Sequence, residues 1–432
     1  MASRNHRSGH RSLREYLSRR RDQSHDEAHL VIETHEPQSV IEHPLVYPGE
    51  PEMIADDEAL IALCAELKAA GVFAYDTEFI GETSYHPRLC LIQVATGGRV
   101  VLIDPIQSAI DNRQSPINLA PLWELLADAG VCKIVHAGQP DLTPVVRHLD
   151  KPPRNIFDTQ IAAGFVGMTY PASLHDLISH YMQVKLPKAM TFTRWDQRPL
   201  SAHHLRYAVD DVRYLPAIHD AIVRRLAERG RTTWAAQEFA ALEQVERYRF
   251  DAETTMQRIL KMTHQPHQVR LLLKQYVRIR DRLAENRDLP PRSILKDRTL
   301  VDLARAAPTS EEQVLAVSSF PRHLLSGTAE RFVKVTEKVM ASEAWTEPGK
   351  RIKPLSRAQR QQLDAGWLAL KELCEREEVA LGLAASRKNF GDLAAAALRK
   401  KKLPESHALL TGWRQGLVEP VVTGLIAEES RG

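Results

Sequence analysis

The chain has 432 residues, 43% of them hydrophobic, with 58 lysines and arginines against 55 aspartates and glutamates and a net charge of +3. Length and composition predict a soluble protein of two to four domains, and so small a charge says little about a nucleic-acid partner. No apolar run is long enough to span a membrane, the polar amino terminus predicts no signal peptide, and the four cysteines lack the spacing of a disulfide framework or a metal site; we therefore expect a cytoplasmic protein without membrane contact.

Residues 1–45 predict a disordered basic arm. The first 21 residues contain seven arginines and a single acid, Glu15, and a mixed, proline-containing stretch follows. Three roles are open for such an arm: a solvated tail, a mitochondrial transit peptide, or a flexible clamp on phosphate groups.

The first predicted element of the globular part is an amphipathic helix over residues 54–72. Leu60, Leu63 and Leu67 recur at helical spacing, acids cluster at the start, and Gly71 follows as a stop signal. This pattern predicts a helix with one buried face.

Strands are predicted next. Residues 73–79 form one, the two β-rich runs around Gly97 and Gly98 form a hairpin, and residues 132–138 contain a further short strand. Asp141 follows at the start of a helical pattern. Strands and helices in this order predict an α/β domain whose sheet begins antiparallel.

The strand 73–79, FAYDTEF, places two carboxylates, Asp76 and Glu78, in apolar surroundings. Alternate residues of a strand share a face, so these two side chains project together. Either the strand reaches the surface here and the acids are solvated, or the acids bind a metal ion together. Two acids alone do not decide between these readings.

A later helix is predicted from Ser201, a suitable N-cap residue. Besides an apolar stripe, this helix carries Tyr207, Asp211, Tyr214 and Ile218 at spacings of three and four residues, which place them on a second face. Two tyrosines and an isoleucine are unusual on a solvated face. We therefore expect a helix that lies between the core and a cleft.

Asp76, Glu78, Asp141 and Asp211 together form a candidate metal site. Four carboxylates packed together repel one another unless a cation neutralises them. An all-oxygen site suits Mg²⁺ or Mn²⁺, and two such ions can activate a water on one side of a phosphodiester and stabilise the departing 3′ oxygen on the other. Tyr207, one helical turn before Asp211, is placed to position that water and to help take up its proton.

Three motifs carry a resemblance to a known family: DTEF (76–79), HAGQPD (136–141) and YAVDD (207–211). They resemble the exonuclease motifs of the DEDD superfamily in its tyrosine-containing branch, and their order and intervals are most similar to those of the ribonuclease D family. Segments between and around the motifs resemble the same family as well, among them YHPRLCLIQ (85–93), FDTQIAA (157–163) and WDQRPLSAHHLRYAVDDVRYL (195–215). The resemblance implies a ribonuclease-H-like α/β domain with a mixed sheet over residues 46–225. It also implies 3′-to-5′ hydrolysis of RNA that releases nucleoside 5′-monophosphates.

Two positions near the motifs allow a different assignment. Asp210 adjoins Asp211, but only Asp211 completes the YxxxD spacing and the one-turn pairing with Tyr207. His136 precedes Asp141 by five residues, as in the HxxxxD motif of the histidine-containing branch. Because His136 occupies the second-motif position, we expect a buried structural histidine.

The segment LPKAMTFTRW (186–195) departs from the usual run of the family, in which Gln, Ser and Asp stand between a Lys and a Trp. Lys188 and Trp195 are present, whereas the other places hold Thr191, Thr193 and Arg194. This difference leaves the metal ligands untouched and puts the finer substrate contacts in doubt. Arg194 either meets a phosphate or is a solvated surface residue.

Two helical bundles are predicted after a helical linker over residues 226–262. Residues 263–345 resemble an HRDC domain, the helical module shared by RecQ-type helicases and ribonuclease D, most closely in RDLPPRSILKDRTLVDLA, where Pro290-Pro291 breaks a helix. Residues 352–432 repeat the theme more weakly and include the basic run RKKKLP. Such bundles can hold RNA by its phosphates or serve as scaffolding. The resemblance favours binding for the first bundle and leaves the second open.

The whole sequence predicts a monomeric, metal-dependent 3′–5′ exoribonuclease that uses two Mg²⁺ or Mn²⁺ ions and acts on tRNA precursors or other small structured RNAs. It has no GxxxxGK[ST] loop, which argues against a helicase or an ATPase. Two alternatives stay open: a DNA-directed 3′–5′ exonuclease of the same fold, and a non-catalytic RNA-binding protein that has kept the fold. Metal-dependent release of mononucleotides from RNA, compared with DNA, distinguishes the three.

Overall fold

The computed structural model describes residues 42–106, 117–184, 194–261, 265–321, 324–346, 354–400 and 402–429. The predicted basic arm up to residue 41 lies outside the described residues, as do Lys188, Thr191, Thr193 and Lys401. Within the described ranges, no helix combines the length and the apolar character needed to cross a membrane. All four cysteines are free thiols.

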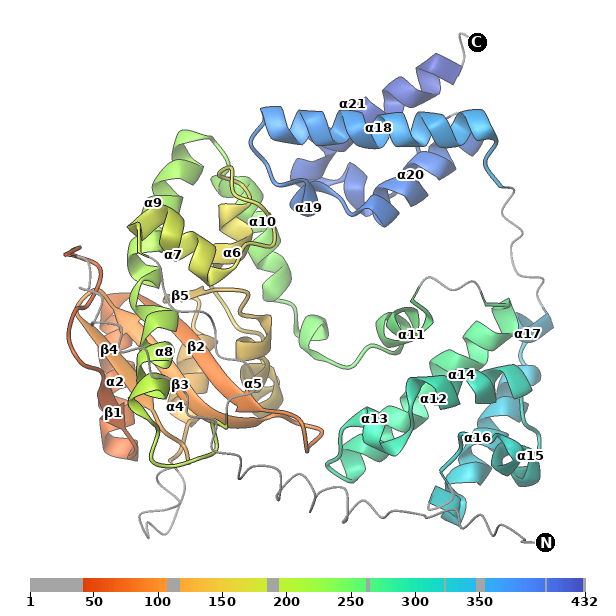
Figure 1. The fold of residues 1–432 in the computed structure, drawn as a ribbon, viewed down its shortest axis with the longest axis horizontal. Coiled ribbons are helices and arrows are strands. Elements are labelled where there is room, and N and C mark those ends of the chain that lie inside the picture. The colour runs from red at the N-terminus through yellow and green to blue at the C-terminus, as the bar shows by residue number, and fades with distance from the viewer. Residues whose placement is uncertain are drawn as a thin grey trace, which may run out of the picture. The chain divides into compact units, whose positions relative to one another are not determined.

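A six-stranded mixed sheet is the centre of the first domain (Figure 1). Its strands are β1 (Glu52–Ile54), β2 (Val72–Ile80), β3 (Arg88–Thr96), β4 (Arg99–Ile103), β5 (Cys132–Val135) and β6 (Ile156–Asp158). They lie in the order β1-β4-β3-β2-β5-β6; β2 with β3 and β3 with β4 are antiparallel, and the other neighbours are parallel. The sheet confirms the predicted α/β class and the hairpin between β3 and β4. The three-residue strand β1 was not predicted.

Helices lie on both sides of this sheet. They are α2 (Asp57–Ala70), α4 (Ala120–Leu126), α5 (Gln139–Leu149), α6 (Thr159–Ala163), α7 (Leu174–Met182), α8 (Ala202–Arg213) and α9 (Leu215–Glu228). α8 contacts β2, β3 and β4, and α9 contacts β2, β3 and β5. Figure 1 shows α2 and α4 on the side of the sheet opposite to α8.

The ends of α2 are as the sequence predicts. The Asp56 side chain accepts a hydrogen bond from the backbone N–H of Ala59 and so caps the amino-terminal end. Gly71, with φ of 73°, donates its N–H to the carbonyl of Leu67 and ends the helix. A glycine adopts this left-handed conformation without the steric penalty that a side chain would cause.

The helix predicted from Ser201 is two helices. Ser201 caps α8 as predicted, in a reciprocal capping box with His204. α8 ends at Arg213, and α9 begins two residues later with Pro216 in its first turn. A proline has no N–H to extend the preceding helix and is well suited to the start of a new one.

This break changes the role of two residues. Tyr214 and Ile218 are 4% and 0% exposed and belong to the hydrophobic core. The prediction that they share a cleft-lining helical face with Tyr207 and Asp211 is wrong, because both side chains are buried and both residues lie beyond the end of α8 at Arg213.

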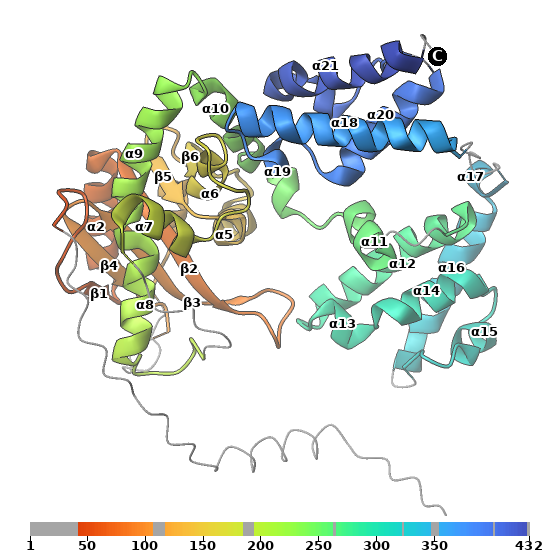
Figure 2. The ribbon, with the colours of Figure 1, turned by 45° about the horizontal axis from the view of Figure 1, so that its top comes forward.

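All described elements after α9 are helical (Figure 2). The first group is α10 (Thr232–Leu242), the 3₁₀ helix η2 (Val245–Tyr248), α11 (Ala252–Leu260), α12 (His267–Asn286), α13 (Pro291–Ile294), α14 (Asp297–Ala306), α15 (Glu311–Ala316), α16 (Leu325–Met340) and α17 (Glu343–Thr346). α11, α12, α13, α14, α15 and α16 share one hydrophobic core. The helix break predicted at Pro290-Pro291 is present: Pro290 lies between α12 and α13, and Pro291 begins α13. α11 supplies Met256 and Leu260 to this core, although the predicted start of the bundle, residue 263, lies after it.

The second bundle repeats the order of the first. It consists of α18 (Arg357–Arg376), α19 (Leu381–Ala384), α20 (Arg387–Lys400), the 3₁₀ helix η4 (Ala408–Leu410) and α21 (Gly412–Glu429). A 20-residue helix, a four-residue helix and a longer helix follow one another in both bundles. The turn after the first helix also repeats, because Asp288 and Glu378 both have left-handed φ values, 47° and 50°. The weak repeat in the sequence thus has a counterpart in the backbone.

The second bundle packs against α10 and the segment after α6 through aromatic contacts and hydrogen bonds from a charged side chain. The rings of Trp234 and Trp413 stack with centroids 5.4 Å apart, and Phe165 lies edge-on to Trp413 at 4.8 Å. The buried guanidinium of Arg231 donates hydrogen bonds to the carbonyls of Phe165 at 2.9 Å and Glu378 at 3.2 Å. In the second bundle, the turn after the first helix, which both bundles share, therefore contacts Arg231.

Candidate active site

Two carboxylates lie on one face of the central strand β2. Asp76 is paired with Gln93 of β3 and Glu78 with Leu91, so both acids project from the same face of the sheet. The register with β3 then shifts between Glu78 and Phe79 in a β-bulge. Bulges bend a strand locally and re-aim its side chains, and they are frequent beside active sites.

Asp141 approaches β2 from the amino-terminal end of α5. The last parallel pair of β2 and β5 is Ala74 with Ile134. After β5 the chain enters α5, whose first turn carries Asp141. The hydroxyl of Tyr75 donates to the Asp141 carbonyl at 3.2 Å, and the hydroxyl of Thr77 donates to the Asp141 carboxylate. Thr77, which stands between the two acids of the strand, thus holds the third acid.

The turn before α5 leaves no room for a side chain. A Cβ atom on Gly138 would lie 2.4 Å from the Cβ atom of Val135 in β5, so only glycine fits there. The buried carboxylate of Asp158 accepts a hydrogen bond from the Gly138 N–H at 3.2 Å and fixes this turn against α6. His136, in the same turn, is hydrogen-bonded to the Thr159 hydroxyl at 3.0 Å, and burial lowers its pKa to about 4. His136 is therefore held within the fold, in keeping with the predicted structural role, but it is half-buried where a buried residue was predicted.

α8 brings Asp211 to the acids of β2. Carboxylate oxygens of Asp76, Glu78 and Asp211 lie within 4.8 Å of one another. Asp210 is not in this group and forms an ion pair with Arg213 at 3.5 Å. The structure thus places Asp211, and not its neighbour, in the cluster.

Tyr207 lies one turn before Asp211 on α8. Its ring is tilted against Trp195 with centroids 6.1 Å apart, and Trp195 also meets His204 edge-on at 5.1 Å. Burial raises the pKa of the Tyr207 phenol, and the charges of Asp211 and Glu78 raise it further. The phenol therefore keeps its proton and can both donate and accept a hydrogen bond.

Burial raises the pKa of all four candidate acids, and repulsion from the other carboxylates raises the pKa of Asp76, Glu78 and Asp211 further. Burial, with Asp211 and Asp141 as further causes, raises the pKa of Glu78 to about 9. The pKa of Asp211 rises to about 8, that of Asp141 to about 6, and that of Asp76 well above its ordinary value, in each case mainly through burial. For Asp141 the hydrogen bond from Thr77 opposes the shift. Four ionised carboxylates are thus unfavourable here without a counter-charge.

This donor set fits a divalent cation. The cluster offers only carboxylate oxygens, which are the ligands that Mg²⁺ and Mn²⁺ prefer. Asp141 lies outside the group of three, but its charge raises the pKa of Asp76, Glu78 and Asp211 and so acts on all of them. A cation bound among these groups would supply the missing counter-charge.

A buried arginine fixes the loop that carries Trp195. Arg198 forms a bidentate ion pair with Asp104, with Nη2 and Oδ1 2.6 Å apart, and the two side chains are 6% and 0% exposed. The same guanidinium donates to the carbonyls of Trp195 at 2.7 Å, Gln197 at 2.8 Å and Cys90 at 2.7 Å. One side chain therefore ties the loop before α8 to β3 and to the end of β4.

Arg194 is an exposed residue of the same loop. Its guanidinium pairs with the Asp196 carboxylate, at 2.9 Å from Nε to Oδ1 and 3.1 Å from Nη2 to Oδ2. The Arg194 charge is thus balanced within the chain, in keeping with the surface role that was one of its two predicted alternatives.

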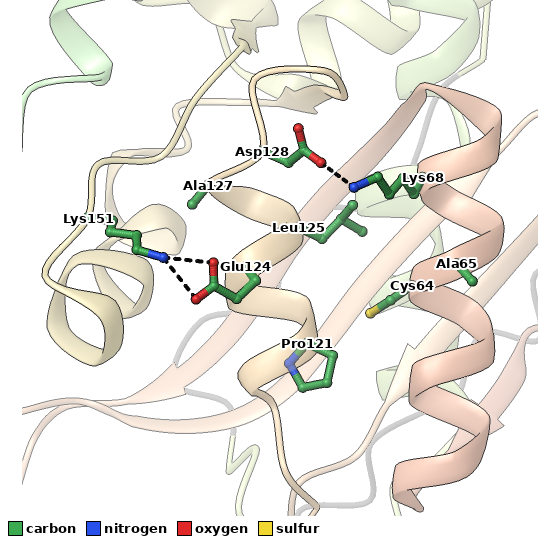
Figure 3. Close-up of a pocket in the computed structure, with 9 residues that line it drawn as sticks. All are labelled: Cys64, Ala65, Lys68, Pro121, Glu124, Leu125, Ala127, Asp128 and Lys151. Carbon is green, nitrogen blue, oxygen red and sulfur yellow. Dashed lines mark hydrogen bonds and ion pairs between the residues drawn. The ribbon is translucent and has the colours of Figure 1, made fainter.

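A separate cavity of about 430 Å³ lies between α2 and α4 (Figure 3). Its lysines are each paired with an acid, Lys68 with Asp128 at 2.8 Å and Lys151 with Glu124 at 3.0 Å. None of the clustered carboxylates or Tyr207 lines this cavity. It is therefore not part of the candidate active site.

Comparison with known proteins agrees with this geometry. Residues 51–227 match the 3′–5′ exonuclease family, and residues 271–336 match the HRDC domain family. The chain is 32% identical over 383 residues to ribonuclease D of Zymomonas mobilis, a match that covers 87% of this chain and 93% of the relative. The chain belongs to the ribonuclease D family.

Other ribonuclease D relatives support the same assignment. Ribonuclease D of Gluconacetobacter diazotrophicus is 30% identical over 370 residues, covering 85% of this chain and 90% of the relative. The crystal structure of Escherichia coli RNase D, described as an exoribonuclease involved in structured RNA processing, superposes with a TM-score of 0.71 at 25% identity and covers 88% of this chain and 99% of that one. Like the ribonuclease D proteins it matches, the chain is a 3′–5′ exoribonuclease, and its substrate is RNA.

Three residues that lie at or beside the candidate active site of this ribonuclease D family member were not identified from the sequence: Thr77, Gln93 and Arg198. Thr77 and Arg198 contact partners 64 and 94 residues away, which no local spacing reveals. Gln93 did leave a signal, because it is a lone amide within the apolar run LCLIQVA.

Proposed function

We propose that Asp76, Glu78, Asp141 and Asp211 hold two divalent cations, Mg²⁺ or Mn²⁺, at which the 3′ end of RNA is hydrolysed to nucleoside 5′-monophosphates. The observation that carries the proposal is the convergence of half-buried carboxylates with raised pKa from β2 and α8, beside Asp141 of α5, whose charge raises the pKa of all three. When bound, the two cations would activate the attacking water and stabilise charge on the departing 3′ oxygen. Thr77 would keep Asp141 oriented toward the other three acids.

Tyr207 is proposed to orient the attacking water through its hydroxyl. The variant Tyr207→Phe is expected to lower kcat by about 10²–10⁴-fold, the usual contribution of a positioned acid–base group. RNA affinity should stay unchanged, because the ring that packs on Trp195 is kept. Single-turnover cleavage and filter binding measure the two quantities. Tyr214→Phe, which removes a hydroxyl from a buried core residue, is the matched control, and equal rates for both variants would contradict the role of Tyr207.

The proposed substrates are tRNA precursors or other small structured RNAs. The description of the E. coli relative as an enzyme of structured RNA processing supports this choice. The first helical bundle carries exposed cationic side chains on α12, α13 and α14 and between them, namely Arg278, Arg282, Arg287, Arg292, Lys296 and Arg298. Such side chains bind phosphates without regard to sequence, which suits a domain that retains RNA near an exonuclease site.

The second bundle is proposed to be scaffolding. The turn around Glu378 and the ring of Trp413 are both used in contacts with Arg231, Phe165 and Trp234, which supports a structural role. The domain limits are proposed as predicted, with the exonuclease domain over 46–225, a linker over 226–262, and bundles over 263–345 and 352–432; α11, at the end of the linker, packs into the core of the first bundle. We also propose a monomer in a reducing cytoplasm, which the free cysteines support.

Removal of metal provides the test of this function. A 5′-labelled RNA with an unpaired 3′ tail is incubated with the full chain in Mg²⁺, in Mn²⁺ and in EDTA, beside a DNA of the same sequence. We expect a ladder that shortens from the 3′ end of the RNA with either metal and no cleavage in EDTA. Equal shortening of the DNA would favour the DNA-directed exonuclease. RNA binding without shortening in any metal would favour the non-catalytic protein.

A further inference from the structure

Gln93 is a buried amide that has no hydrogen-bond partner among the described residues. It lies in β3 and is 0% exposed, and neither its amide nitrogen nor its amide oxygen is hydrogen-bonded within the described part of the chain. Buried polar groups in folded proteins are almost always hydrogen-bonded, because loss of hydration without a replacement partner costs free energy. An amide whose nitrogen and oxygen are both unpaired therefore indicates a hydrogen-bond partner that becomes available in another state of the protein, such as the metal-bound state.

The sheet register places the polar side chain of Asp76 next to Gln93. Gln93 lies directly opposite Asp76 in the antiparallel pair of β2 and β3. Side chains so paired lie on the same face with Cβ atoms about 4.5–5.5 Å apart, within reach of a glutamine side chain. On its other side Gln93 is paired with Leu102 of β4, and its same-face neighbours along β3 are Leu91 and Ala95. Among these neighbours only Asp76 has a polar side chain.

The chemistry of an amide suits this position. An ionised carboxylate has more lone pairs than one metal bond uses, and the remaining ones accept hydrogen bonds that set its orientation. The NH₂ group of Gln93 can donate such a bond to Asp76. An amide carries no charge, unlike lysine or arginine, so it would orient the carboxylate without competing with the cation for it.

We infer that Gln93 is a positioning residue that hydrogen-bonds to the Asp76 carboxylate and fixes it for binding of a divalent cation. This inference rests on the proposed function, because it requires Asp76 to be a metal ligand. It assigns to β3, which supplies none of the clustered acids, a direct part in building the metal site.

The test is direct binding of Mn²⁺ to the full chain in the absence of RNA, measured by titration calorimetry and by the electron paramagnetic resonance signal of free Mn²⁺. Gln93→Met removes the amide and keeps the shape of the side chain. We expect it to weaken Mn²⁺ binding by about 10–100-fold, the usual effect of losing a residue that orients a metal ligand. In EDTA the variant should unfold at the same or a higher temperature than the wild type, because it loses an unpaired buried amide.

The matched control is Leu91→Met. Leu91 lies on the same strand and the same face, opposite Glu78, is equally buried and has no polar group. It should bind Mn²⁺ as the wild type does. If Gln93→Met is too unstable to study, Gln93→Leu provides the same comparison with a similar apolar side chain.

Asp76→Asn separates failure of the inference from failure of the proposed function. Loss of Mn²⁺ binding in Asp76→Asn together with unchanged binding in Gln93→Met would overturn the role of Gln93 and leave the metal site standing. Equal Mn²⁺ binding by the wild type and Asp76→Asn would overturn both. Weaker binding in Gln93→Met, with Leu91→Met unaffected, would establish the positioning role.

Discussion

Replacing Asp76 with asparagine is expected to lower the rate of mononucleotide release from RNA by at least about a thousandfold. Asp76 is at the centre of the cluster, since its pKa is raised by the charges of Asp141, Asp211 and Glu78 in addition to burial. An amide in its place removes one of the anionic oxygens that would hold the cations. Metal ions supply several kcal/mol of charge stabilisation in the transition state, and about 4 kcal/mol corresponds to a thousandfold in rate.

The same variant should fold normally. Asparagine has the size of aspartate, and the substitution removes one of several carboxylates that repel one another, so the melting temperature in EDTA should equal or exceed that of the wild type. Asp210→Asn is the matched control, because Asp210 is a half-buried neighbouring acid outside the cluster and pairs with Arg213. Single-turnover assays should find Asp210→Asn within about tenfold of the wild-type rate, less than the contribution of one positioned catalytic group. A rate for Asp76→Asn above one tenth of the wild-type rate would be incompatible with a role as metal ligand.

Arg198→Met is expected to destabilise the exonuclease domain by about 3–5 kcal/mol, the usual cost of breaking a buried ion pair. The substitution leaves the Asp104 carboxylate, which is 0% exposed, without its guanidinium partner, and it removes three hydrogen bonds to backbone carbonyls. A cost of this size should lower the melting temperature by roughly 10 °C for a domain of this size. Because the loop also carries Trp195 against Tyr207, we expect kcat to fall by about tenfold to a hundredfold through misplacement of the site.

A double-mutant cycle isolates the ion pair. Asp104→Asn in the Arg198→Met background removes the uncompensated charge, so the double variant should be more stable than the sum of the two single changes predicts. Arg194→Met is the control from the same loop. It breaks the Arg194–Asp196 pair, in which the arginine is 65% exposed, and exposed pairs contribute about 0.2–1 kcal/mol. Additive effects of the Arg198 and Asp104 substitutions would show that the pair does not hold the loop.

Local sequence pattern was sufficient to predict the strand and the helix that carry most of the candidate site. Asp76 and Glu78 are two residues apart in a strand, and Tyr207 and Asp211 are four apart in a helix, and these periods are properties of the backbone itself. The structure brings Asp76, Glu78 and Asp211 together, which the family resemblance implies and which the local spacings alone do not indicate. Their catalytic roles stay predictions until the variants are measured.

Features that depend on distant partners were not accessible in this way. The strand β1 has three residues and is defined by its pairing with β4, about fifty positions later in the chain. Arg198 and Asp104 are 94 residues apart, and neither has a neighbour in sequence that reveals the pair. The break between α8 and α9 did leave a signal, Pro216, but the apolar pattern continues through Tyr214 and Ile218 and indicated one helix.

The contact between α10 and α21 has a consequence for synthesis of the chain. Glu238 and Arg414 form a bidentate ion pair beside the Trp234–Trp413 stack although they are 176 residues apart. At a translation rate of about 5–20 residues per second, roughly 10–35 s separate their appearance on the ribosome. During that interval α10 of the nascent linker exposes apolar surface around Trp234 that α21 later covers, so a chaperone that shields such surface would raise the yield of folded protein. A chain shortened before α21 would expose this surface permanently and would be prone to aggregate.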